Sequence, residues 1–174
     1  MTDALPLVGV VLGSASDTPY AQTLSQTLES FGIPHEVTIT SAHRTPDDTV
    51  RYARNAASRG LRVLVCVAGL SAALPGVVAA NTTLPVIGVP VPAGTLGGLD
   101  ALLSIAQMPP GVPVASVGIG GAKNAALLVV RVLALQDEAL GRQLNEWTET
   151  ESSRILKARE AVEGMPAAPC EAYR

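Results

Sequence analysis

One of the two histidines in the chain, His43, lies beside Arg44 in the segment SAHRTP, residues 41–46. An imidazole has the pKa range for proton transfer near neutral pH, and a guanidinium can hold a phosphate through two parallel hydrogen bonds. A lone loop histidine is more often an ordinary solvated residue. SAHRTP therefore predicts acid–base chemistry on a phosphate-bearing ligand only if other ligand-binding groups lie nearby.

Such groups occur in GSASD, residues 13–17, which places two hydroxyls and a carboxylate at the start of an expected helix. Backbone N–H groups and the helix dipole favour an anion there, so Ser14 and Ser16 can bind phosphate. Asp17 would repel an anion and is better suited to accept hydrogen bonds from sugar hydroxyls. Capping of the helix explains the same residues equally well.

A third segment, AGLSAALPG at 68–76, is a run of small residues entering a helix. Small residues let the backbone approach a ligand closely, although they supply no acid or base. Tight packing of helix on sheet is the alternative interpretation.

The elements that must position these segments are predicted by hydrophobic periodicity. Short continuous apolar runs predict strands over 7–13, 33–40, 61–69, 85–91 and 113–120. Helical spacing and start and stop signals predict helices near 16–32, 45–60, 72–80, 99–107 and 122–135.

This alternation of strands and helices predicts an α/β fold, a three-layer doubly wound parallel sheet with helices on both faces. Ligands of such sheets bind outside the carboxyl ends of the strands. The three candidate ligand-binding segments, GSASD, SAHRTP and AGLSAALPG, each follow or end a predicted strand, so we expect them to lie together at one edge of the sheet.

A long polar C-terminal helix follows, with an apolar stripe that runs from Leu140 to Val162. The stripe is longer than the face of a small domain, so we expect part of it to pack on another subunit. We expect one catalytic domain over 1–164, including this helix, and a loose tail over 165–174.

Composition excludes several classes of protein. The net charge is −3 and the basic residues are scattered, which argues against a nucleic-acid partner. Gly and Pro interrupt the apolar runs well before the roughly 20 residues of a membrane span. MTDALP has no secretory pattern, so we expect a cytoplasmic protein with no membrane partner. Cys66 and Cys170 form no CxxC or Cys/His cluster, which argues against a zinc site or a disulfide.

Six ordered motifs together resemble the PurE family of purine biosynthesis, over about residues 7–140. They are GSASD, SAHRTP, LPG at 74–76, GVPV at 88–91, SIAQMPPGVPV at 104–114 and AKNAALL at 122–128. The resemblance implies a flavodoxin-like fold, a homo-octamer with active sites at subunit contacts, and chemistry that needs neither a metal nor an organic cofactor. It also implies a ribonucleotide substrate, with carbon dioxide as an intermediate or a substrate.

Site residues follow from the same resemblance. His43 matches the family's general acid/base, and Ser14, Asp17 and Arg44 match its ribonucleotide-binding residues. The full set of substrate-binding candidates is Ser14, Ser16, Asp17, Ser41, Arg44, Gly69, Ser71, Ala72 and Leu74.

The family contains two reactions, and the motifs favour the mutase, which moves a carboxylate from N5 to C4 of carboxyaminoimidazole ribonucleotide. Mutases usually read AGGAAHLPG where this chain reads AGLSAALPG, whereas direct carboxylases tend to read AGRSNALSG. Ser71 and Ala73 therefore keep direct carboxylation of aminoimidazole ribonucleotide open as an alternative. A flavodoxin-like binding module without catalysis is more distant, because the chain has few aromatics to hold a flavin.

Overall fold

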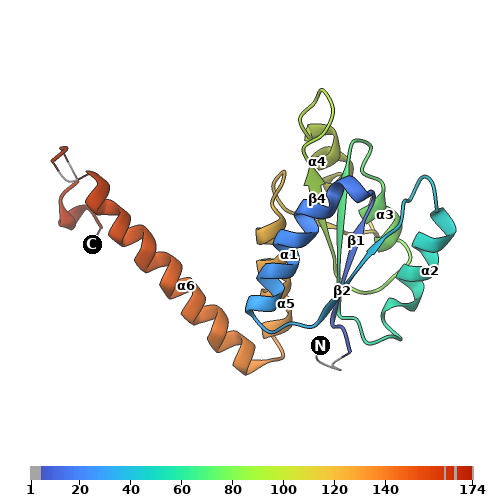
Figure 1. The fold of residues 1–174 in the computed structure, drawn as a ribbon, viewed down its shortest axis with the longest axis horizontal. Helices are drawn as coiled ribbons and strands as arrows, with labels where there is room; N and C mark the ends of the chain where they lie inside the picture. Colours follow the sequence, from blue (N-terminus) through green and yellow to red (C-terminus); the bar gives the residue numbers. More distant parts are fainter. Residues whose placement is uncertain (1–4, 163, 167, 174) are drawn as a thin grey trace. The chain divides into compact units, whose positions relative to one another are not determined.

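The computed structural model describes residues 5–162, 164–166 and 168–173 (Figure 1). Within these residues the strands are Val8–Leu12 (β1), His35–Ile39 (β2), Val63–Gly69 (β3), Val86–Val91 (β4) and Ala115–Ser116 (β5). The helices are Thr18–Ser30 (α1), Pro46–Ala56 (α2), Leu74–Ala79 (α3), Leu99–Ala106 (α4), Ala122–Ala134 (α5) and Glu138–Ala158 (α6). Short 3₁₀ turns lie at Ala15–Asp17, Arg159–Val162 and Cys170–Tyr173.

All strand pairs are parallel, and the strand order is β2-β1-β3-β4-β5. This is the flavodoxin-like order, in which the direction of winding reverses between β1 and β3. Figure 1 shows α1 and α5 on one side of the sheet and α2 and α3 on the other. The predicted three-layer doubly wound fold is confirmed, and the point of reversal is where such sheets bind ligands.

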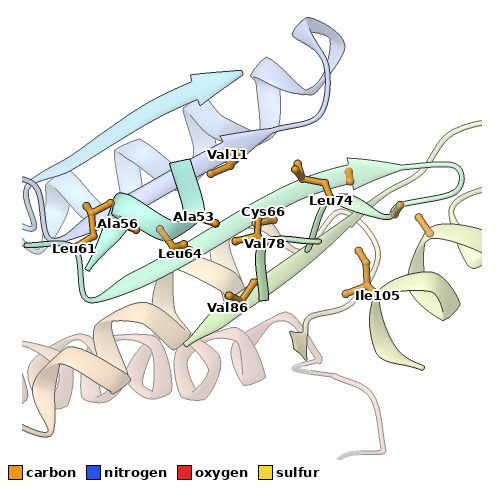
Figure 2. Packing of buried hydrophobic residues seen from close by; sticks show 13 residues of the cluster. Val11, Ala53, Ala56, Leu61, Leu64, Cys66, Leu74, Val78, Val86 and Ile105 are labelled. Carbon is orange, nitrogen blue, oxygen red and sulfur yellow. The ribbon is translucent and has the colours of Figure 1, made fainter. Parts of the chain in front are cut away.

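The core lies against both faces of β3, whose residues from 63 to 68 are all buried. On one face, Leu64 and Cys66 belong to a cluster with Ala53 of α2 and Val78 of α3 (Figure 2). Full burial of a leucine or valine side chain such as Leu64 or Val78 contributes about 1.5–3 kcal/mol to folding. Burial on both faces explains why the strand is a continuous apolar run in the sequence.

Gly88 sets the distance between β4 and α4. A Cβ at this position would lie 2.4 Å from Cγ2 of Ile105, which is fully buried. Any side chain at position 88 would therefore push α4 away from the sheet.

β5 is much shorter than the strand predicted over 113–120. It pairs with β4 only through Ala115 and Ser116. Pro90 of β4 has no N–H to continue the ladder, and only its carbonyl is used, by the amide of Gly120 at 2.8 Å. The segment therefore follows β4 without forming regular strand pairs.

The chain divides into two compact units, Met1–Leu133 and Ala134–Arg174. In the second unit, Asp137 is the N-cap of α6, and its Oδ1 accepts hydrogen bonds from the amides of Ala139 and Leu140 at 2.9 and 3.0 Å. On the predicted stripe, Ile155 is 63% exposed. Such exposure agrees with the expected packing of α6 on another subunit, which stays a prediction.

Two sequence predictions fall partly outside the described residues. The expected loose tail, 165–174, includes residues 167 and 174, and the expectation that the chain has no secretory pattern rests partly on residues 1–4. Within the part of the chain that the structure describes, no helix is long and apolar enough to cross a membrane.

Candidate active site

A cavity of about 810 Å³ lies at the carboxyl ends of β1 to β4. The segments after β1, β2 and β3 each line it, as predicted from the strand-end rule. All ten residues singled out from the sequence line this cavity: Ser14, Ser16, Asp17, Ser41, His43, Arg44, Gly69, Ser71, Ala72 and Leu74.

The segment after β1 is held by hydrogen bonds among its own side chains. Ser14 is extended, and its Oγ accepts from the Ser16 amide at 3.4 Å and lies 3.1 Å from the Ser16 hydroxyl. Ser14 thus caps the 3₁₀ turn that precedes α1, and not α1 itself. A hydroxyl can still accept or donate once more, and both serines face the cavity.

Asp17 is the one acidic residue among the side chains that line the cavity, and it is only 5% exposed. Burial raises the pKa of its carboxyl, while hydrogen bonds from the Ser16 hydroxyl and the Ser14 backbone act in the opposite direction. Asp17 occupies the N-cap position of α1 but makes no side-chain capping bond there. Its oxygens therefore have room to accept hydrogen bonds from a ligand.

Arg44 joins the segment after β2 to the segment after β1. Its Nη2 donates a hydrogen bond to the carbonyl of Gly13 at 3.1 Å, and its Nε donates one to the Ser41 hydroxyl at 3.3 Å. A guanidinium has five N–H groups, so three remain for a ligand. With its geometry fixed by two protein contacts, the group is well placed to bind an anion in the cavity.

His43 is at the tip of a tight turn. The amides of Arg44 and Thr45 both donate to the carbonyl of Ser41, at 3.2 and 2.8 Å. The first of these bonds makes Ala42 and His43 the two central residues of a β-turn. The imidazole is exposed, lines the cavity and can therefore reach a bound molecule.

The remaining wall is small and apolar. Ala72 and Leu74 are buried, while Ser71 is exposed toward the cavity. Leu70 has a φ of 55°, a left-handed conformation that costs a non-glycine residue about 1–2 kcal/mol. Its Cδ2 would lie 2.9 Å from a Cβ at Gly94, so the side chain reaches across to the segment after β4.

Five cavity residues outside the three predicted segments were missed by the sequence analysis: Pro19, Tyr20, Val91, Pro92 and Ala93. Val91, Pro92 and Ala93 end or follow β4, and the strand-end rule that selected the first three segments would have found them. Tyr20 comes from the first turn of α1. Only the rotation of that helix about its axis decides that Tyr20 faces the cavity, and the sequence carried no signal for it.

The structure gives no support to metal or thiol chemistry in the part of the chain that it describes. Among the described residues, no group of three His, Cys, Asp or Glu side chains lies close enough together to hold a metal ion. Cys66 is buried in β3 as a free thiol, and burial raises its pKa. It is therefore an inert core residue.

The comparisons with known proteins all find the same family. The family model described as AIR carboxylase matches residues 7–154. An N5-carboxyaminoimidazole ribonucleotide mutase of Thermotoga maritima is 48% identical over 91% of this chain and 93% of the relative. One of Mycobacterium tuberculosis, with the same name, is 58% identical over 78% of each chain.

A plant protein and a solved structure are also similar. The chloroplastic phosphoribosylaminoimidazole carboxylase of Vigna aconitifolia is 47% identical over 90% of this chain, but over only 28% of its own length. The crystal structure of Treponema denticola PurE superimposes with a TM-score of 0.83 at 30% identity, covering 91% of this chain and 99% of that one.

Proposed function

Because the chain belongs to the AIR carboxylase family, we propose that it converts N5-carboxyaminoimidazole ribonucleotide into 4-carboxy-5-aminoimidazole ribonucleotide in de novo purine biosynthesis. The observation that carries this proposal is the cavity at the strand ends, where His43 and Arg44 meet Ser14 and Asp17. Relatives named as the mutase of this reaction support the proposal; the one from Thermotoga maritima is 48% identical over 91% of this chain.

The sugar phosphate is held at the β1 side of the cavity. Arg44 offers three N–H groups beyond its contacts to Gly13 and Ser41, and the Ser14 hydroxyl, which accepts from Ser16, adds its own proton for the phosphate. The Asp17 carboxylate accepts hydrogen bonds from the ribose hydroxyls. These contacts fix where the imidazole ring of the substrate lies.

His43 moves the proton. The bond between N5 and the carboxylate carbon breaks, carbon dioxide leaves, and the imidazolium of His43 gives its proton to that nitrogen. The electron-rich C4 then attacks the carbon of carbon dioxide, and the neutral imidazole takes the C4 proton. The proton is returned, so the enzyme ends as it began and the reaction is an isomerisation.

Carbon dioxide must stay in the cavity between the two steps. Ala72 and Leu74 are buried, and the neighbouring wall has no acid or base that would react with it. Acid–base help is typically worth ~10²–10⁴-fold, so confinement next to C4 supplies much of the remaining acceleration. Ser41 and Ser71, with the Gly69 backbone, complete the polar contacts to the substrate.

Direct carboxylation of aminoimidazole ribonucleotide is the second candidate. The sequence between β3 and α3 favours it, because Ser71 and Ala73 agree with the carboxylase pattern in place of the mutase one. The two reactions share the ribonucleotide contacts and His43, and they differ in the source of the carboxyl group.

Supplying each substrate separately to the pure protein distinguishes the two reactions. Product from carboxyaminoimidazole ribonucleotide without added bicarbonate supports the mutase. Product only from aminoimidazole ribonucleotide with bicarbonate identifies the carboxylase. No 4-carboxy product from either substrate contradicts both assignments.

We further propose that residues 1–164 act as one catalytic domain in a cytoplasmic homo-octamer, with the active sites at subunit contacts. The family match to residue 154 includes most of α6, which supports one domain. Large exposed apolar side chains in the loop after β4 and on α4, namely Leu96, Leu99 and Leu103, support a contact with another subunit. Light scattering on the purified protein tests the assembly, and a monomer would contradict it.

A further inference from the structure

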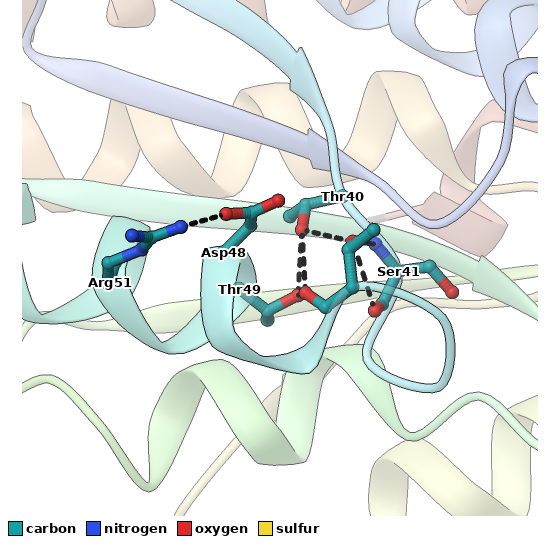
Figure 3. A network of polar contacts seen from close by, with 6 residues as sticks. Thr40, Ser41, Asp48, Thr49 and Arg51 are labelled. Carbon is teal, nitrogen blue, oxygen red and sulfur yellow. Dashed lines mark hydrogen bonds and ion pairs between the residues drawn. The ribbon is translucent and has the colours of Figure 1, made fainter.

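Three threonine hydroxyls lie directly beneath the turn that carries His43 and Arg44. Thr40 follows β2, Thr45 ends the turn, and Thr49 lies one helical turn into α2. Figure 3 labels Thr40 and Thr49 in this network of polar contacts. Thr40 is 7% exposed and Thr49 is fully buried. None of the three threonines lines the cavity.

The hydroxyls are joined to one another. The Oγ1 of Thr40 lies 2.8 Å from that of Thr49 and 3.1 Å from that of Thr45. The Thr49 hydroxyl also donates to the carbonyl of Thr45 at 3.2 Å. The Thr45 hydroxyl accepts a hydrogen bond at 2.9 Å from the amide of Ser41. Ser41 is the first residue of the turn.

These distances allow each hydroxyl to donate once and accept once. In the arrangement that gives every hydroxyl one donor and one acceptor, the amide of Ser41 donates to Thr45, Thr45 to Thr40, Thr40 to Thr49, and Thr49 to the carbonyl of Thr45. The Thr45 hydroxyl also has the Ser41 carbonyl within reach at 3.3 Å, a second contact to the turn. Both the side chain and the backbone of Thr45 are therefore fixed, at the residue that ends the turn. A buried hydroxyl that loses its partner is costly, so the chain of bonds resists any one member moving alone.

We propose that Thr40 and Thr49 are positioning residues that hold the turn over 41–45 in place and so aim the His43 imidazole at the substrate. This inference rests on the proposed function for its catalytic consequence. Arg44 has its own contacts to Gly13 and Ser41, which do not involve the threonines. Loosening the turn should therefore disturb proton transfer by His43 more than phosphate binding by Arg44.

Thr49→Val tests the proposal, because valine has nearly the shape of threonine but no hydroxyl. We expect kcat to fall about tenfold, a part of the roughly 100-fold that a displacement of about 1 Å can cost. KM should change much less than kcat, and Thr49→Ser, which restores the hydroxyl, should recover most of the lost rate. Thr40→Val breaks the same chain of bonds independently and should show the same split.

Tyr52→Phe is the matched control. Tyr52 is also on α2, and its hydroxyl donates to Oε1 of Glu36 on β2 at 2.7 Å. The variant loses a partly buried hydrogen bond between the same two elements, but not one that contacts the turn. Wild-type kcat in Thr49→Val, no recovery in Thr49→Ser, or an equal loss of kcat in Tyr52→Phe would each overturn the proposal.

A second measurement does not depend on catalysis. Loss of one hydrogen bond should open the turn about fivefold more often, so the Arg44 and Thr45 amides should exchange with deuterium about fivefold faster in Thr49→Val. Unchanged exchange would overturn the proposal. If the wild-type protein turned over neither ribonucleotide, the proposed function would fail, and faster exchange in the variant would still support the role of the threonines in holding the turn.

Discussion

Arg44 links the segment after β2 to the segment after β1 in the proposed phosphate site. Replacing it with glutamine measures how much this side chain contributes to substrate binding. Arg44→Gln ends the side chain at about the position of Nε, and it removes the positive charge and most of the donors, including the Nη2 that contacts Gly13. Arg44 leaves three N–H groups for the ligand after its contacts to Gly13 and Ser41. A hydrogen bond to a charged group contributes about 1.5–3 kcal/mol, and because Arg44 is exposed we use about 2 kcal/mol in total.

A loss of about 2 kcal/mol corresponds to a rise in KM of about 30-fold at 25 °C. We expect kcat to fall only a few-fold, because His43 keeps its place in the turn. Steady-state kinetics with carboxyaminoimidazole ribonucleotide give both constants, and calorimetric titration with the product gives the affinity directly. The effect should shrink as salt is added, since part of it is electrostatic.

Arg54→Gln is the matched control for that experiment. Arg54 is an exposed arginine of α2 whose Nε donates to Oδ1 of Asn81 at 3.2 Å, and it does not line the cavity. Its replacement should leave KM within a factor of about two, as surface substitutions away from a site usually have small effects. Unchanged KM in Arg44→Gln, or an equal rise in both variants, would refute the assignment of Arg44 to the phosphate.

Two further substitutions test the other walls of the cavity. Asp17→Asn should raise KM by about tenfold or more through loss of a charged acceptor for the ribose. Because burial raises the pKa of Asp17, its stabilising effect is present below the ordinary carboxyl value of 3.8 and is lost as pH rises through the folded value. Asp17→Asn should therefore gain more in Tm over wild type at pH 7 than at pH 3.5, and an equal gain at both would contradict this pKa direction. Leu70→Gly relieves about 1–2 kcal/mol of backbone strain, largely offset by the flexibility of glycine, so Tm should move by no more than about 4 °C. The same change opens the cavity wall, so a larger share of substrate should end as free aminoimidazole ribonucleotide and carbon dioxide; an unchanged share would mean that Leu70 does not retain carbon dioxide.

Much of the fold was predictable because its strands are buried on both faces. β1, β3 and β4 are continuous apolar runs, and their limits in the structure lie within two residues of those predicted. The prediction was too long for β5, where Pro90 on the neighbouring strand removes a donor from the ladder. Pairing with a particular neighbour is a tertiary property, and the sequence of 113–120 alone does not contain it.

The site was predictable to the level of its loops. The carboxyl ends of parallel strands meet at one edge, so placing GSASD, SAHRTP and AGLSAALPG after three strands was enough to bring them together. The contact between Arg44 and the carbonyl of Gly13 was not predictable, since it depends on the path of a long side chain between two strand ends. The threonine hydroxyls were equally hidden, because single threonines in a sequence carry no sign of which hydroxyls will face one another.

The most direct test of the central claim, that His43 transfers a proton to and from a ribonucleotide held by the neighbouring loops, is a single-turnover experiment with His43→Asn. We predict that the variant binds carboxyaminoimidazole ribonucleotide within a few-fold of the wild-type affinity but forms 4-carboxy product at least about 100-fold more slowly. A variant that binds equally well and keeps more than about a tenth of the wild-type rate would contradict the role of His43 as the acid–base group.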